Sequence, residues 1–260
     1  MMCGQTGIIF GNAERSEDEL KYFREIFQRL LLLNRIRGPH ATGEAAVNGD
    51  GNFQLLKRPL EAAAFTLLPE YGEFMNSLKP GATLLMGHTR FATVGSAEKI
   101  ENAHPIRSGC CLGTVNGTIF NADTLFRKFR LSRFAEVDSE LIVRLADKCA
   151  PGGKIQVEKL LDRIRHCRGQ LTAVLTSLVT PKEVVILKGN KPLSLFFNPI
   201  MNAIIYSSEN THIMTALRGD KNWLKLNLPH MTCAVFDVED LISPQIHRLK
   251  FITQSRRNRP

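Results

Sequence analysis

The stretch TLLMGHTRFATVG, residues 83–95, combines the two features that recur along this chain. Its first part is an apolar run with the length of a buried strand, and its second part is polar and ends in glycine. This change predicts a strand over residues 83–90 followed by a turn. Arg90 at the strand end could present its guanidinium fork to a carboxylate, with the Thr93 hydroxyl beside it. A strand-ending turn with a surface arginine is the alternative when the segment is taken alone.

A second apolar strand, CLGTVNGTI at residues 111–119, carries an Asn-Gly pair. The side-chain amide of Asn116 and the backbone N–H of Gly117 can converge on one oxygen, which is the geometry of an oxyanion hole. An Asn-Gly turn in a hairpin is the commoner meaning of such a pair. Further along, Asp138 opens an expected helix, where its carboxylate could bind a substrate ammonium or serve only as an N-cap.

Cys3 lies almost at the start of the chain, directly ahead of the apolar strand GIIF at residues 7–10. A thiol at a chain start can use the α-amino group of its own residue as a base. The two pKa values, about 7.7–8 for the amine and about 8.5 for the thiol, make this proton transfer nearly balanced. A nucleophile paired with an N-terminal amine is an established arrangement in covalent catalysis. Position alone fits an incidental cysteine equally well.

The expected elements follow the order strand, helix, many strands, two helices, many strands. The first helix covers residues 16–34 and begins with a capping box formed by Ser16 and Glu19. The sequence NGDGN at 48–52 is typical of a hairpin turn between two short strands. Later helices are expected over 138–149 and 157–167, and later strands over 171–179, 183–189, 193–197, 203–208, 231–238 and 246–251. This order predicts packed sheets with helices outside, a layered α+β domain.

The composition indicates one soluble domain. The chain has 260 residues, of which 43% are hydrophobic, and no window approaches the roughly 18 consecutive apolar residues of a membrane span. No secretory signal is visible, so we expect a cytoplasmic protein without membrane association. We assign residues 1–252 to a single domain and residues 253–260 to a basic, disordered tail. The six cysteines lack metal-ligand spacing, so we expect free thiols, no metal and no cofactor.

The net charge of +9 raises the question of nucleic acid. Basic residues cluster in RKFRLSR (127–133), RIRHCR (163–168) and SRRNRP (255–260). Aromatic residues are sparse among them, and no nucleic-acid-binding motif accompanies them. We therefore interpret the charge as solvated and do not expect a nucleic-acid partner.

Six segments, in this order along the chain, resemble the class II glutamine amidotransferases. The segments are Cys3-Gly4, Arg37-Gly38 with Thr42-Gly43, GHTRFATVG at 87–95, NAHPI at 102–106, NGTIFN at 116–121 and VDSELI at 137–142. The resemblance implies a four-layer αββα sandwich, in which two antiparallel sheets lie between helical layers. This is the fold of the N-terminal-nucleophile hydrolases.

The same resemblance implies catalytic roles. Cys3, once N-terminal, is the nucleophile and its amine the base, while Asn116 and Gly117 form the oxyanion hole. The side-chain amide of glutamine is then cleaved through a γ-glutamyl thioester to give ammonia and glutamate.

Four further residues bind the substrate in this resemblance. Arg90 holds the α-carboxylate of glutamine with help from Thr93, Phe91 belongs to the same binding segment, and Asp138 receives the α-ammonium. A zwitterionic substrate explains why one cationic and one anionic group are needed.

Three positions depart from the family pattern. Two methionines precede Cys3, so translation from Met2 or further processing must expose the nucleophile. Val94 and Val115 stand where many members carry histidine, and Pro39-His40 occupies a place where an acidic residue is frequent.

The leading expectation is therefore a glutaminase domain that supplies ammonia to an acceptor enzyme or subunit carried by a separate partner protein. A γ-glutamyl amide or peptide hydrolase would use the same clamp of Arg90 and Asp138. A catalytically silent domain that binds a partner or nucleic acid is the alternative from another class.

Overall fold

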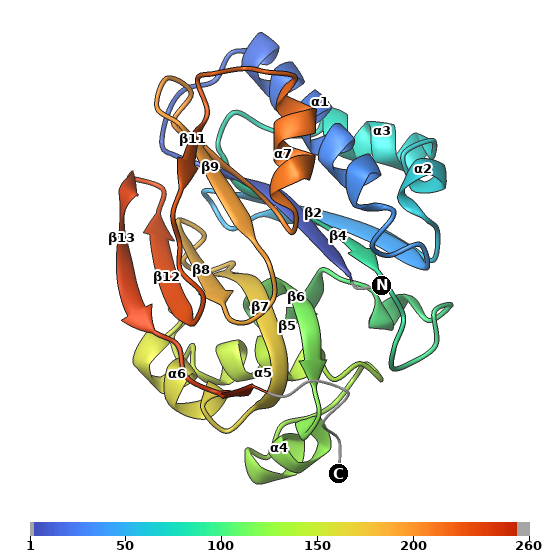
Figure 1. The fold of residues 1–260 in the computed structure, drawn as a ribbon, viewed down its shortest axis with the longest axis vertical. Coiled ribbons are helices and arrows are strands. Elements are labelled where there is room, and N and C mark those ends of the chain that lie inside the picture. The colour runs from blue at the N-terminus through green and yellow to red at the C-terminus, as the bar shows by residue number, and fades with distance from the viewer. Residues whose placement is uncertain (1–2, 254–260) are drawn as a thin grey trace.

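The chain forms two β-sheets that pack face to face, with helices on the outer face of each sheet (Figure 1). The computed structural model describes residues 3–253. Sheet I has the spatial order β11 (Leu224–Leu226), β9 (Ser194–Asn198), β10 (Ala203–Ser207), β1 (Gly4–Phe10), β4 (Ala82–Arg90), β2 (Ala41–Asn48) and β3 (Phe53–Arg58). Sheet II has the order β13 (Asp240–Arg248), β12 (Thr232–Asp237), β8 (Glu183–Lys188), β7 (Arg168–Ser177), β6 (Cys111–Ile119) and β5 (Ile106–Ser108). A short strand, β14 (Ile252–Thr253), runs parallel to the start of β7, and the other pairings among the described strands are antiparallel.

Two groups of helices enclose the sheets, at the top and the bottom of Figure 1. Sheet I is covered by α1 (Glu17–Asn34), α2 (Ala62–Phe65), α3 (Pro69–Asn76) and α7 (Asn210–Leu217). Sheet II is covered by α4 (Ala122–Lys128), α5 (Glu140–Lys148) and α6 (Val157–Ile164). A 3₁₀ turn, η1 (Ile100–Asn102), lies between β4 and β5. The four layers confirm the predicted αββα sandwich, the fold of the N-terminal-nucleophile hydrolases.

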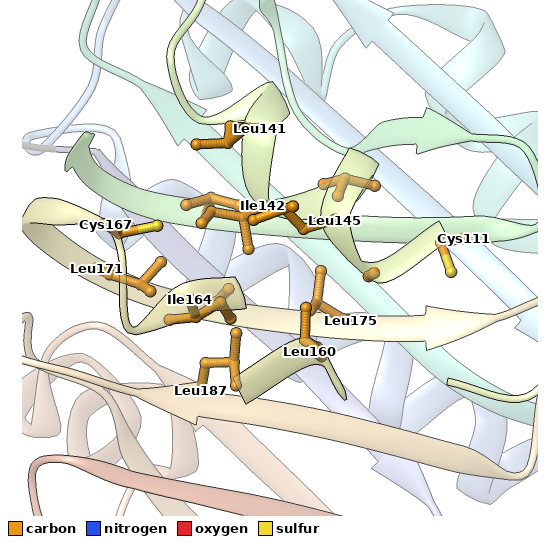
Figure 2. Close-up of a cluster of buried hydrophobic side chains, with 14 of the residues drawn as sticks. Cys111, Leu141, Ile142, Leu145, Leu160, Ile164, Cys167, Leu171, Leu175 and Leu187 are labelled. Carbon is orange, nitrogen blue, oxygen red and sulfur yellow. The ribbon is translucent and has the colours of Figure 1, made fainter. Parts of the chain in front are cut away.

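Side chains point alternately to the two faces of each strand, and together they form three apolar layers. In β7, Leu171 and Leu175 face the helices of sheet II, as Figure 2 shows, whereas Val174 faces sheet I. In β1, Ile8 faces α1 and Ile9 faces the opposite sheet. This alternation follows from the two-residue period of a strand and assigns each functional side chain to one face.

The first helix begins as predicted. The Ser16 side chain accepts a hydrogen bond from the Glu19 N–H, and the Glu19 carboxylate accepts one from the Ser16 N–H at 2.9 Å. Leu20, Phe23 and Phe27 are buried at helical spacing against sheet I. Local capping and periodic burial therefore favour the same helix.

Several expectations differ from the structure in detail. The Asn116-Gly117 pair is not a hairpin turn, because β6 continues to Ile119 and pairs with β7 along its whole length. Ser139 is the N-cap residue of α5, and its side chain makes no cap hydrogen bond to that helix. The last long strand begins at Asp240 rather than residue 246, and α4 and α7 were not anticipated.

None of the helices within residues 3–253 is long and apolar enough to cross a membrane. The last described residues still belong to sheet II, since Ile252 lies opposite Arg168 and Thr253 opposite Gly169. The predicted basic tail lies, apart from Thr253, outside the described residues, and so do Met1 and Met2.

Candidate active site

Cys3 lies directly before β1, at the end of the space between the two sheets. Ile9 belongs to the apolar layer between the sheets, and side chains at positions 7, 5 and 3 follow on the same face of the strand. Gln5 confirms this orientation, because its Nε2 donates to Thr114 Oγ1 of sheet II at 3.1 Å. The Cys3 side chain is half-buried. It is therefore covered by protein yet not sealed from solvent.

Three hydrogen bonds hold the Cys3 residue, one of which runs from Cys3 Sγ to the Phe91 carbonyl at 3.7 Å. The Phe91 N–H donates to Cys3 Sγ at 3.3 Å, and Arg37 Nε donates to the Cys3 carbonyl at 3.0 Å. Gly38 lets the chain after Arg37 approach β4, since a Cβ there would lie 2.4 Å from the Thr89 carbonyl oxygen. The Arg37-Gly38 pair of the sequence thus brings a cation beside the residue that carries the thiol.

Opposing influences act on the Cys3 thiol. Burial raises its pKa, and the nearby Asp138 carboxylate acts in the same direction. The hydrogen bond from the Phe91 N–H and the charges of Arg90 and Arg37 favour the thiolate and lower the pKa. The balance leaves the pKa above the ordinary value, so proton removal needs a base close to the sulfur.

Arg90 ends β4 on the same face as His88 and is buried. Its Nη1 donates to the Ser96 carbonyl at 2.8 Å, and its Nη2 donates to the carbonyls of Val94 and Gly95 at 2.9 and 3.1 Å. These bonds wrap the loop after β4 around the guanidinium. A guanidinium has five N–H donors, so Arg90 retains donors for a further acceptor.

The other two residues expected in this segment differ in their surroundings. The Phe91 ring packs against His40 at a centroid distance of 5.1 Å, and its backbone contacts the thiol. Thr93 is exposed on the loop. Its expected role, to help Arg90 hold a carboxylate, stays a prediction.

The loop that holds Arg90 is anchored by Glu136. Its carboxylate accepts hydrogen bonds from the Ser96 N–H and Asn102 Nδ2, both at 2.9 Å, and pairs with Lys99. The hydrogen bond from Lys99, with those from Ser96 and Asn102, lowers the pKa of Glu136 to about 2. Glu136 therefore remains an anion that fastens the loop next to Arg90.

Asn116 carries a buried donor whose acceptor is missing. The residue is 2% exposed, and its Nδ2 has no hydrogen-bond partner among the described residues. The following Gly117 has φ +154°, and a Cβ there would lie 2.0 Å from the Gln170 carbonyl oxygen. Only glycine fits this position without displacing β7. A buried amide donor without an acceptor is costly, which makes this strand segment a candidate ligand contact.

Asn116 lies at the same end of the molecule as Cys3. Thr114, two residues before it on the same face, bonds Gln5. At the end of the strand, the Ile119 N–H donates to the Asp138 carboxylate, and the charge of Asp138 acts on the Cys3 thiol. The residues on both sides of Asn116 along β6 are therefore connected to the start of β1, Thr114 through Gln5 and Ile119 through Asp138.

Some residues of the site had no role assigned from the sequence. Glu136 and Glu209 reach it only through the folded chain, and nothing in their local sequence marks them. The glycine after Arg37 marked this position in the sequence, but it did not indicate which residue Arg37 contacts. Away from the site, Cys110, Cys111 and Asp147 place potential ligand atoms within 4.8 Å at the opposite end of β6. The Asp147 carboxylate there already accepts from Ser108 Oγ and the Cys110 N–H, both at 3.1 Å.

The fold corresponds to a known class: the chain resembles the glutaminase domains of class II glutamine amidotransferases. The glutamine phosphoribosylpyrophosphate amidotransferase of B. subtilis has a similar fold, with a TM-score of 0.69 and 19% identity over 95% of this chain and 49% of that chain. No protein-family model matches the chain.

Curated relatives include two proteins of similar likeness. One is 7-cyano-7-deazaguanine synthase 2 of Sulfurisphaera tokodaii, 23% identical over 80% of this chain and 43% of the relative. The other is the glutamine–fructose-6-phosphate aminotransferase (isomerizing) of Gloeobacter violaceus, 28% identical over 84% of this chain and 35% of the relative. The chain thus spans less than half the length of these relatives.

Proposed function

We propose that this chain hydrolyses the side-chain amide of glutamine and delivers the ammonia to an acceptor. The observation that carries the proposal is the buried Asn116 amide, a donor without an acceptor at the same end of the molecule as the Cys3 thiol. A pre-oriented donor beside a nucleophile is what an amide-cleaving site requires, because negative charge develops on the carbonyl oxygen during attack.

The first step forms a thioester. The α-amine of Cys3, as the first residue of the active form, takes the thiol proton, and the sulfur attacks the amide carbon. The carbonyl π electrons move to oxygen, which accepts hydrogen bonds from Asn116 Nδ2 and the Gly117 N–H. The C–N bond then breaks, and the Cys3 ammonium returns the proton so that ammonia leaves.

The second step regenerates the enzyme. Water attacks the γ-glutamyl thioester, and the Cys3 amine takes a proton from it. The C–S bond breaks, the sulfur recovers a proton, and glutamate is released. One amine thus serves as base and acid in both halves of the reaction.

Charged residues at the two sides of the site suit a zwitterionic substrate. Arg90 retains N–H donors that can bind the α-carboxylate of glutamine. Asp138 lies close enough to Cys3 for its negative charge to raise the pKa of the thiol, and the same charge suits the α-ammonium of glutamine. We include Phe91 and Thr93 in the binding segment, although the exposure of Thr93 makes its contribution depend on the bound ligand.

We further propose that the acceptor is an enzyme or subunit on a partner protein in the cytoplasm. One relative is named a glutamine–fructose-6-phosphate aminotransferase and the structural neighbour a glutamine amidotransferase, and these names support ammonia delivery. The six cysteines are free thiols, as they would be in a reducing compartment.

The deciding experiment measures ammonia release from glutamine by protein produced with Cys3 as its first residue, verified by intact mass. The wild type should turn over, and Cys3→Ala should not, with an unchanged melting temperature. Turnover by a preparation that quantitatively retains Met2 would remove the amine from the mechanism. Faster cleavage of γ-glutamyl peptides than of glutamine would favour the γ-glutamyl hydrolase on the same fold.

A further inference from the structure

The carbonyl of Cys3 is held by a side chain that is itself held by a second one. Arg37 Nε donates to the Cys3 carbonyl at 3.0 Å, and Arg37 Nη1 forms an ion pair with Glu209 Oε1. The Arg37 side chain is 10% exposed and that of Glu209 38%. The buried guanidinium therefore has its orientation set by a carboxylate nearer the surface.

The hydrogen bond from Arg37 holds Cys3 at a position that lies outside the strand pairing of sheet I. Pairing of β1 with β4 begins at Gly4, which lies opposite Thr89, so Cys3 stands outside the ladder. Its sulfur is held by the N–H and the carbonyl of Phe91, and its carbonyl is held by Arg37. A residue outside a ladder regains backbone freedom when such an anchor is lost.

The position of Glu209 in the fold does not account for its contact. Glu209 is the N-cap residue of α7, yet its side chain makes no cap hydrogen bond to that helix. The carboxylate points instead to Arg37, which follows α1. The ion pair thus joins the end of α1 to the start of α7, next to the first strand.

Other groups around Arg37 do not replace the carboxylate. His212 in the first turn of α7 is buried; burial and the charge of Arg37 lower its pKa, and the charge of Glu209 offsets part of this effect. His212 carries no negative charge in any protonation state that it adopts near neutral pH, so it cannot pair with the guanidinium as Glu209 does. Arg37 Nη2 is buried and has no acceptor among the described residues. Glu209 is therefore the anion that both neutralises and orients this guanidinium.

We propose that Glu209 is a positioning residue for Cys3, which it holds in place through Arg37. The inference rests on the proposed function, in that Cys3 must be the nucleophile for its position to matter in catalysis. Glu209 contacts Arg37, which holds the Cys3 carbonyl, so we expect its effect on the chemical step.

Three variants separate positioning from simple stability. Glu209→Ala should lower kcat for ammonia release roughly 10- to 100-fold, the scale on which small misplacements of a reacting group act, with KM within about twofold. Glu209→Gln keeps an acceptor for Arg37 and should recover most of the loss. Glu70→Ala is the matched control, because Glu70 is likewise a carboxylate at the N-terminal end of a helix, α3, and is paired with an arginine, Arg58. It should leave kcat unchanged.

A second measurement is independent of turnover. Hydrogen exchange at the Phe91 amide, which donates to Cys3 Sγ, should be faster in Glu209→Ala and unchanged in Glu209→Gln and Glu70→Ala. Wild-type kcat and wild-type exchange in Glu209→Ala, with or without a lower melting temperature, would overturn the proposal. If Cys3→Ala retained full activity, the proposed function would fail, while the exchange experiment would still decide whether Glu209 fixes Cys3.

Discussion

At the scale of single residues, the amide of Asn116 offers a direct test of the chemistry. Asn116→Ala should lower kcat by roughly 10²–10³, the usual cost of one oxyanion donor. KM for glutamine should change little, because the ground-state carbonyl gains less from the bond than the tetrahedral intermediate does. Asn116→Asp should be at least as harmful, since it adds negative charge beside the oxyanion. Steady-state ammonia release, with melting temperatures as a folding control, measures both; a stable Asp variant with normal kcat would exclude the role.

Arg90 has two tasks that a lysine cannot share. Its guanidinium contacts three carbonyls of its own loop, and in the proposed function it also offers a planar pair of donors to a carboxylate. We expect Arg90→Lys to raise KM for glutamine far more than Arg58→Lys, a surface substitution. If the clamp holds ground and transition states equally, kcat stays close to wild type. An unchanged KM would remove Arg90 from the substrate contacts.

Two groups of candidate site residues could be selected from the sequence because polar residues end or interrupt an apolar run. Arg90 is the last residue of β4, and Asn116-Gly117 interrupts the apolar sequence of β6, although the strand itself continues to Ile119. The sequence could not distinguish a strand from a turn at Asn116, since an Asn-Gly pair can occur in both. Glu136 and Glu209 could not be found at all, because their partners Ser96 and Arg37 are 40 and 172 residues away.

At the scale of elements, the loop after β4 depends on one anion. Glu136 has a pKa of about 2, depressed from 4.5, so its stabilisation of the loop is complete above about pH 4.5 and is lost as the pH falls through about 2. At neutral pH, Glu136→Gln should speed hydrogen exchange at Ser96 and raise KM, because the loop also holds Arg90. Wild-type exchange at Ser96 in that variant would contradict the anchor. Glu239→Gln, which removes another exposed carboxylate paired with a lysine, is the control.

The helices that the sequence did not reveal are short and depend on packing. The eight residues of α7 have no side-chain cap, and the helix is held by Ile213, Ala216 and Leu217 against the core of sheet I. The seven residues of α4 end in a basic run that favoured a solvated segment. Isolated helices of this length are only marginally stable, so α4 and α7 form because they pack against the rest of the protein. By contrast, α1 has both a capping box and a long apolar face.

At the scale of the whole molecule, stability and chemistry occupy separate layers. Leu145 is fully buried between α5 and sheet II, remote from the polar end of the layer between the sheets. Leu145→Ala should cost about 2–5 kcal/mol of unfolding free energy and lower Tm by several degrees. The kcat of the folded enzyme should not change. Calorimetry and activity at a temperature well below Tm test this; a large fall in kcat there would show coupling between the layers.

The hydrogen bond from Gln5 to Thr114 has a mechanical consequence. Apolar contacts are non-directional, so the layer of Ile9, Leu84 and Val174 resists separation of the sheets more than it resists sliding. The directional bond at the Cys3 end makes that end the pivot of any shear between the sheets. This bond therefore opposes sliding at the end of the molecule where the thiol and the Asn116 amide lie on opposite sheets.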